Sequence, residues 1–153
     1  VVSTQVTQWF ESDTNRYMDV TSPDNILVNG RLASGAVVSA HVASQPSHGS
    51  GQRLEIYGSE GTLAIEGGDR RLMGGKTGDT ALQELPIPDR LTWVPDEVPQ
   101  GPAFNVAQMY RRFGEAIRSG QRAEPDFDTA LVRHQLIAAI QRASDRGTRE
   151  QVG

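Results

Sequence analysis

The chain has 153 residues, a net charge of −4 at pH 7 and 37% hydrophobic residues, which suits one domain with a hydrophobic core. This charge gives no strong basic field for nucleic acid or an anionic membrane, and no apolar run reaches the roughly 20 residues of a membrane span. Cysteine is absent, which excludes disulfides, thiolate nucleophiles and cysteine-bound metals and fits a reducing cytoplasm.

The first two thirds of the chain read as short strands separated by turns. Alternating and β-branched residues predict strands at residues 2–9, 26–32, 36–43, 53–57, 62–66 and 71–73. Residues rich in Gly, Pro, Asp, Asn and Ser predict the connections, at 22–25, 33–35, 45–51, 58–61 and 67–69. Because the chain opens directly in a strand pattern, we expect it to be a piece of a longer protein.

The segment 74–103 is the least regular part of the chain. Its glycines and prolines predict a loop, with one weak strand at 81–85. A connection of this length is expected to cover a surface or a sheet edge.

The last third is helical. A first helix is predicted over Asn105–Ser119 and stops at Gly120, and a second starts near Pro125-Asp126 and runs to Arg146 before Gly147. The expected buried stripe of the first comprises Val106, Met109, Tyr110, Phe113 and Ile117. That of the second comprises Val132, Leu136, Ala139, Ile140 and Ala143. Strands followed by two amphipathic helices predict an α+β fold with both helices on one face of a sheet.

Three glycine segments have a functional and a structural interpretation. Gly49-Ser50-Gly51 begins like a dinucleotide fingerprint, but it precedes a strand and lacks the third glycine. Gly75-Lys76-Thr77 is similar to a phosphate-binding loop, but no helix pattern follows it. The turn at 58–61 could offer amides to an anion, although a tight turn also explains its glycines. We therefore favour loops and turns at all three.

The polar residues do not assemble into a catalytic or metal site. His41, His48 and His134 have no ligand spacing, and no carboxylate completes a metal site. Asp24, Asp126 and Asp128 occupy turn or cap positions, where local hydrogen bonds account for them. We expect no catalytic, cofactor-binding or metal-binding residue in this chain.

Two ordered series of residues resemble a known family. The first runs S-P-D-N, a strand, G-R-L-x-S-G, a strand, and R-L-E-I-Y-G-S-E-G-T-L-x-I-E-G. The second joins V-A-Q-M-Y-R-R-F-G-E-A-I-R-S-G to P-D-F-D-T-A-L and the terminal helix. Together they resemble the C-terminal domain of the Gfo/Idh/MocA family of NAD(P)-dependent oxidoreductases. Within it, they are most similar to the branch of the fungal galactose-pathway repressor and related sugar dehydrogenases.

The resemblance implies that residues 1–153 form one C-terminal domain with an open, predominantly antiparallel sheet. NAD or NADP would bind to an N-terminal Rossmann domain that this chain lacks. The family's Glu-Lys-Pro and Asp-x-Gly-x-His motifs are also missing, so no catalytic residue of the family carries over to this sequence.

The second face of the strands carries few charges, which is typical of the core of an interface. Its residues are Leu27, Asn29, Val37, Ser39 and His41. The first hypothesis is a substrate-side and dimerisation domain of a sugar or polyol oxidoreductase, which forms a homo-oligomer through this face. The second is a non-catalytic regulator that binds a protein partner, as the galactose repressor does. A free-standing binding module is a third possibility, disfavoured by the strand-like start.

Overall fold

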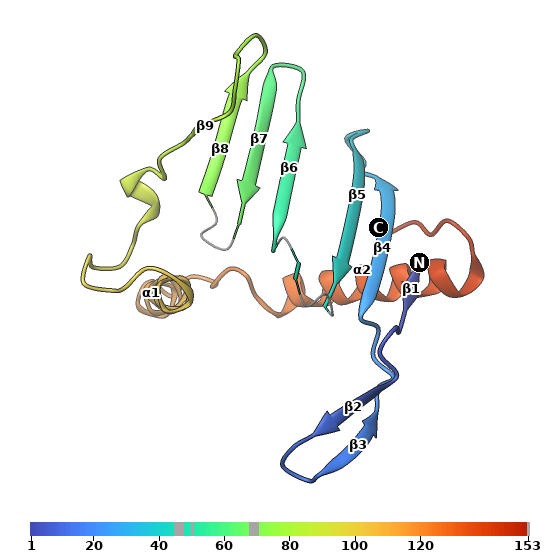
Figure 1. The fold of residues 1–153 in the computed structure, drawn as a ribbon. Coiled ribbons are helices and arrows are strands. Elements are labelled where there is room, and N and C mark those ends of the chain that lie inside the picture. Colours follow the sequence, from blue (N-terminus) through green and yellow to red (C-terminus); the bar gives the residue numbers. More distant parts are fainter. Residues whose placement is uncertain (45–47, 50, 68–70, 153) are drawn as a thin grey trace. The chain divides into compact units, whose positions relative to one another are not determined.

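The structure, a computed structural model, describes residues 1–44, 48–49, 51–67 and 71–152. The loop predicted at 45–51 and the turn predicted at 67–69 therefore lie partly outside the described residues. The chain divides into two compact units, Val1–Ser47 with Pro125–Gly153, and His48–Glu124. Each unit combines antiparallel strands with one α-helix (Figure 1). The predicted α+β class and the antiparallel pairing are confirmed.

The first unit contains five strands among its described residues. They are β1 (Val2–Ser3), β2 (Gln8–Glu11), β3 (Arg16–Asp19), β4 (Asn25–Arg31) and β5 (Val37–Ala43). β1, β4 and β5 form one antiparallel sheet, and β2 and β3 form a separate hairpin. The prediction of one strand over residues 2–9 is wrong for residues 4–7, which lie between β1 and β2. The β2–β3 hairpin was not predicted.

The carboxylate of Asp24 explains the break between β1 and β2. Asp24 accepts hydrogen bonds from the backbone N–H groups of Gln5 and Val6, at 2.8 and 2.7 Å. Its own N–H donates to Ser3 O, and its carbonyl accepts from the N–H of Ser44. The residue is only 7% exposed. Asp24 therefore ties the N-terminal segment to the start of β4 and the end of β5, a larger role than the turn predicted for it.

Helix α2 (Phe127–Arg146) completes the first unit. Asp126 caps its N-terminus by accepting from the N–H of Thr129 at 2.8 Å, as predicted. Gly147 ends the helix with a φ of 63°, a left-handed conformation that glycine adopts without strain. The helix contacts β1, and the N–H of Val2 donates to Ser144 Oγ. Of the residues predicted to be buried, Ala139 is buried, whereas Val132 and Leu136 are exposed.

The second unit contains a four-stranded antiparallel sheet in chain order. Its strands are β6 (Arg53–Tyr57), β7 (Gly61–Glu66), β8 (Arg71–Lys76) and β9 (Gln83–Glu84). β8 continues through Gly74 and Gly75, so the loop predicted from residue 74 begins later. A Cβ on Gly74 would lie 2.5 Å from Leu85 Cδ1. Glycine therefore serves here to let the following segment pass close over a regular strand.

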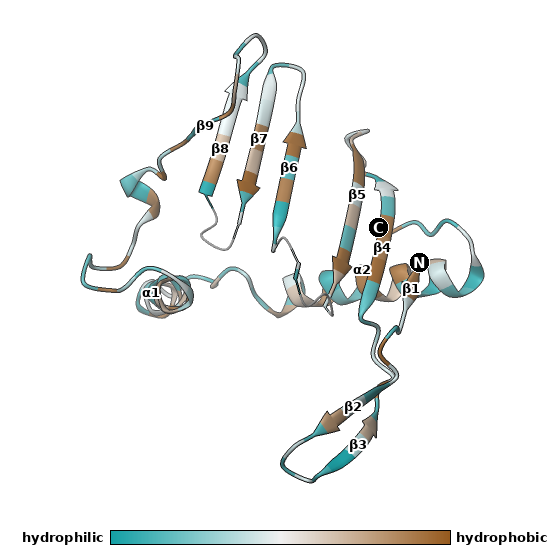
Figure 2. Cartoon of the chain, in the orientation of Figure 1, coloured by the Kyte–Doolittle hydropathy of each residue, from teal (hydrophilic) through white to brown (hydrophobic). Residues whose placement is uncertain are grey.

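The register of this sheet separates two kinds of face. Apolar side chains on one side pair across the strands, namely Leu54, Ile56, Leu63, Ile65 and Leu72. The opposite side carries Arg53, Glu55, Tyr57, Thr62 and Glu66. Figure 2 shows the resulting alternation of hydrophobic and hydrophilic residues along β6.

The segment that follows the sheet is fastened to helix α1 (Pro102–Ser119). Gln108 accepts from the N–H of Trp93 and donates to Leu91 O, at 2.6 and 2.8 Å, and the Arg112 guanidinium lies over the Trp93 ring. A short 3₁₀ helix, η1 (Asp89–Leu91), precedes this contact. The predicted apolar stripe of α1 is exposed in this structure, with Tyr110 at 70%. Among the described residues, no helix is long and apolar enough to cross a membrane.

The Asp24 hydrogen bonds predict a pH dependence of stability. The N–H groups of Val6 and Gln5 lower the pKa of Asp24 from its ordinary value of 3.8. A carboxyl whose pKa falls on folding stabilises the fold above its unfolded pKa, and loses that effect as the pH falls through the lower folded pKa. The thermal midpoint of Asp24→Asn should therefore lie below that of the wild type at neutral pH. The gap should close below a pH of about 3.8.

Thermal unfolding of both proteins across this range checks the prediction. Asp96→Asn, at an exposed turn residue, is the matched control and should follow the wild type at every pH. A gap between wild type and Asp24→Asn that does not change with pH would contradict the proposed role of the charge.

Candidate functional site

The pair β4–β5 carries all the residues predicted as an interaction face. The directly opposed pairs are Leu27–His41, Asn29–Ser39 and Arg31–Val37. Opposed residues of an antiparallel pair project to the same side. The five predicted residues therefore share one face. Arg31, opposite Val37, lies on the same face at one end of the strands.

This β4–β5 face is accessible. Leu27 is 42% exposed and Val37 is 76% exposed. Ile26 and Val28, which project to the other side of β4, are half-buried. His41 Nε2 lies 2.9 Å from Asn25 Oδ1, which fixes the imidazole against the surface of the sheet. The face can thus meet a partner through small, apolar and neutral polar groups.

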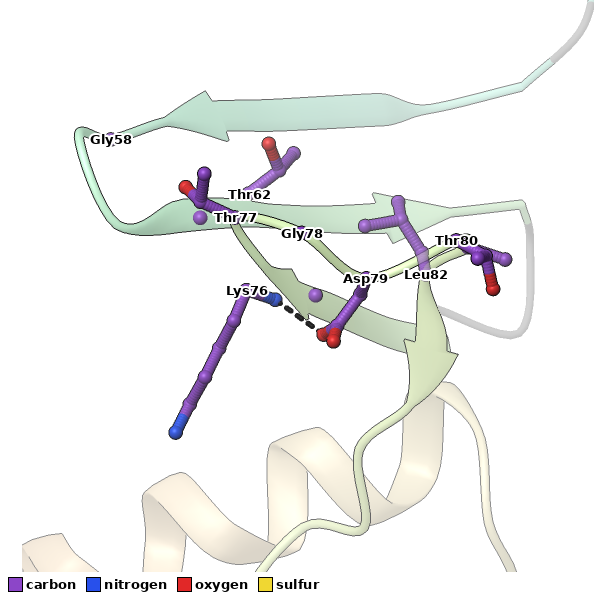
Figure 3. A pocket seen from close by; sticks show the side chains of 11 residues that line it. Gly58, Thr62, Lys76, Thr77, Gly78, Asp79, Thr80 and Leu82 are labelled. Atoms are coloured by element: carbon purple, nitrogen blue, oxygen red, sulfur yellow. Dashed lines mark hydrogen bonds between the residues drawn. The ribbon is translucent and has the colours of Figure 1, made fainter.

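A pocket of about 380 Å³ lies in the second unit, where β7, β8 and the segment after β8 meet (Figure 3). Thr62, Thr77 and Thr80 line it, together with Asp79 and Leu82. Two bonds fasten the segment after β8 to the turn between β6 and β7. The N–H of Thr77 donates to Glu60 O at 2.9 Å, and Thr77 Oγ1 donates to Ser59 O at 3.3 Å.

Two of the three glycine segments considered in the sequence, the turn at 58–61 and Gly75-Lys76-Thr77, line this pocket. Gly58 and Gly61 lie beside Gly75 and Lys76 along its lining, but the geometry is not that of a phosphate-binding loop. Gly75 and Lys76 belong to β8, and the Lys76 side chain extends away from the threonine hydroxyls (Figure 3). A Cβ on Gly61 would lie 2.3 Å from Gly75 O. Glycine at 61 therefore permits close pairing of two strands. The remaining segment, Gly49–Gly51, lies partly outside the described residues.

The histidines remain separate from one another. His41 is on β5, His134 is on α2, and His48 lies outside any helix or strand. Within the described parts of the chain, no group of three or more His, Asp or Glu residues could hold a metal ion.

A polar row on β6 was not predicted from the sequence. Arg53 Nη2 lies 2.7 Å from Glu55 Oε1 and 3.4 Å from Glu66 Oε1, and Tyr57 follows on the same side of the sheet. Interaction with Arg53 and then with Tyr57 lowers the pKa of Glu55, and interaction with Glu55 raises the pKa of Tyr57. The i, i+2, i+4 spacing within a predicted strand was the available signal, because it places three side chains on one face.

The comparison with protein families shows which family the chain belongs to. The family model for the C-terminal α/β domain of the oxidoreductase family, Gfo/Idh/MocA, matches residues 1–152. The chain belongs to this family. Its members are NAD(P)-dependent oxidoreductases that bind the cofactor in their N-terminal domain. Neither the curated proteins nor the solved structures gave a match to the chain.

The structural role of Gly61 can be tested. Gly61→Ala places a Cβ against Gly75 O, and such crowding should lower the free energy of unfolding by about 1–3 kcal/mol. Gly30→Ala is the matched control, since a Cβ there meets nothing within 4 Å. Urea unfolding of both variants measures the difference. Equal stability of the two would contradict the close-pairing explanation.

Proposed function

We propose that residues 1–153 form the substrate-side and dimerisation domain of a cytoplasmic NAD(P)-dependent oxidoreductase that acts on a sugar or polyol. An N-terminal Rossmann domain of the same protein supplies the cofactor site, for NAD or NADP, and the catalytic lysine. The domain alone is not catalytic. The observation that carries the proposal is the family match over residues 1–152.

The distribution of exposed apolar groups supports a domain that binds other protein surfaces. The stripe of α1 exposes Val106, Met109 and Phe113 at 54%, 46% and 53%, and Leu54 and Ile56 on β6 are exposed at 50% and 56%. Exposed apolar groups gathered on single faces mark surfaces that meet other protein. The proposal gives two such partners, the N-terminal domain and a second copy of the chain.

An activity assay tests the enzymatic part. The full-length protein, incubated with NAD⁺ or NADP⁺ and a panel of sugars and polyols, should produce reduced cofactor, and residues 1–153 alone should produce none. Cofactor binding without turnover on any sugar or polyol would instead favour the non-catalytic regulator, similar to the galactose-pathway repressor.

The dimerisation part predicts the effect of a charge on the β4–β5 face. Leu27→Glu places a carboxylate in the contact away from Arg31, and burying an unpaired charge costs several kcal/mol, so the dimer dissociation constant should rise by about 100-fold or more. Size-exclusion chromatography with light scattering measures the change. Gln121→Glu, which adds the same charge at an exposed residue outside the helices and strands, should remain dimeric. A wild-type protein that stays monomeric at high concentration would contradict the proposal.

A further inference from the structure

The β2–β3 hairpin carries a group of exposed apolar side chains. In its register Trp9 stands opposite Met18, and Phe10 stands opposite Tyr17. Opposed residues share a face, and neighbours along a strand alternate between faces, so each face of the hairpin carries one of these two pairs. All four side chains are exposed, from 47% for Phe10 to 71% for Tyr17. Both faces of the hairpin are therefore apolar and accessible.

Little among the described residues covers the hairpin apart from its own two strands. β2 and β3 form a sheet of their own and pack chiefly against each other. In Figure 1 the hairpin projects away from β1, β4 and β5 of the same unit. A two-stranded hairpin alone is at best marginally stable in water, and clustered exposed apolar groups mark surfaces that meet other protein. The hairpin thus has the character of an arm that a partner completes.

The root of the hairpin is fixed. The N–H of Val20 donates to Thr7 O at 2.8 Å, just before β2 and just after β3. One step further out, the Asp24 carboxylate accepts from the N–H groups of Gln5 and Val6. These bonds set the direction in which the hairpin leaves the unit. An arm held in this way loses little conformational entropy when it binds.

The area that a dimer needs favours a second copy of the chain as the partner. A stable interface usually takes about 20–30 residues a side, or about 800 Å² per partner. The β4–β5 face offers only its five predicted residues and Arg31. The three aromatic rings of the hairpin, at their present exposure, would add roughly 350 Å² from each copy. Because the contact of a two-fold dimer is reciprocal, each copy gives one arm and receives one.

The hairpin leaves its unit beside the β4–β5 face. β3 ends at Asp19, and β4 begins at Asn25. Leu27 and His41, which stand opposite each other on the face, lie near this end of β4. A partner seated on the face is therefore within reach of the root of the arm.

The charges of the hairpin disfavour a membrane or a nucleic acid as its partner. Three carboxylates, Glu11, Asp13 and Asp19, and a single cation, Arg16, belong to its two strands and their turn. Anionic lipid surfaces and nucleic acids attract basic segments and repel acidic ones. The exposed rings of the hairpin consequently suit a protein surface.

We propose that the β2–β3 hairpin is an exchanged arm, which packs its apolar faces against the second copy of the chain in the homodimer. This inference rests on the proposed function for the existence of the homodimer. It goes beyond that function by assigning part of the interface to the hairpin, separate from the β4–β5 face.

Sedimentation equilibrium of the full-length protein measures the contribution of the arm. Trp9→Ser and Tyr17→Ser remove a ring from opposite faces of the hairpin. Each should raise the dimer dissociation constant by about 10-fold or more, the loss typical of an aromatic anchor of an interface. Tyr57→Ser is the matched control, because Tyr57 is 73% exposed on β6 and Tyr17 is 71% exposed. It should leave the constant unchanged, and circular dichroism establishes that each variant is folded.

Photo-crosslinking identifies the surface that the arm meets. The full-length variant Tyr17→p-benzoylphenylalanine, irradiated under conditions in which the protein is dimeric, should give a covalent dimer on a denaturing gel. Irradiation that leaves only single chains overturns the arm. Mass spectrometry of those chains then shows whether the residue has reacted with the N-terminal domain of its own copy instead.

Leu27→Glu separates this inference from the proposed function. A dimer that dissociates with Leu27→Glu but keeps its dissociation constant with Trp9→Ser and Tyr17→Ser overturns the arm and leaves the β4–β5 interface standing. A dimer that the two hairpin variants weaken and Leu27→Glu does not keeps the arm and overturns the β4–β5 face as the interface. A wild-type protein that stays monomeric overturns both and leaves the proposed oxidoreductase activity to its own assay.

Discussion

The pairing register of the antiparallel strands is the constraint on which the other features depend. Side chains alternate between the two faces of a strand, so a shift of one residue would exchange every inward group for an outward one. In β4–β5 the register gathers Leu27 and His41 on the accessible side, and in β6–β7 it gathers Tyr57 and Thr62. The β4–β5 face follows from its register alone and needs no residue from outside its own sheet.

The strands and helices that could be predicted are those whose signal is local. The bounds of β6, both helix stops and the face shared by Leu27 and His41 follow from period-two or 3.6 alternation and from glycine. The hairpin β2–β3 was missed because Gln5 and Val6 donate their N–H groups to Asp24, which lies 19 and 18 residues away along the chain. The extension of β8 was missed for a related reason. A glycine usually signals a turn in a sequence. At position 74 it instead leaves room within a regular strand for the side chain of Leu85.

The candidate sites also divide into one with a local sequence signal and one that depends on residues distant in the sequence. The β4–β5 face was predicted because strand alternation alone places its members together. The pocket was not, since it depends on Thr77 reaching back to Glu60 across a segment that the sequence marks only as loop. The family resemblance was available from ordered motifs, and the family match bears out its general part.

The central claim, that the cofactor site lies outside residues 1–153, has a direct test. Fluorescence titration of this chain with NADH and NADPH, beside the same titration of the full-length protein, compares the two. The account predicts saturable binding of one of the two cofactors to the full-length protein and none to residues 1–153. Saturable binding of either cofactor to residues 1–153 alone would contradict it.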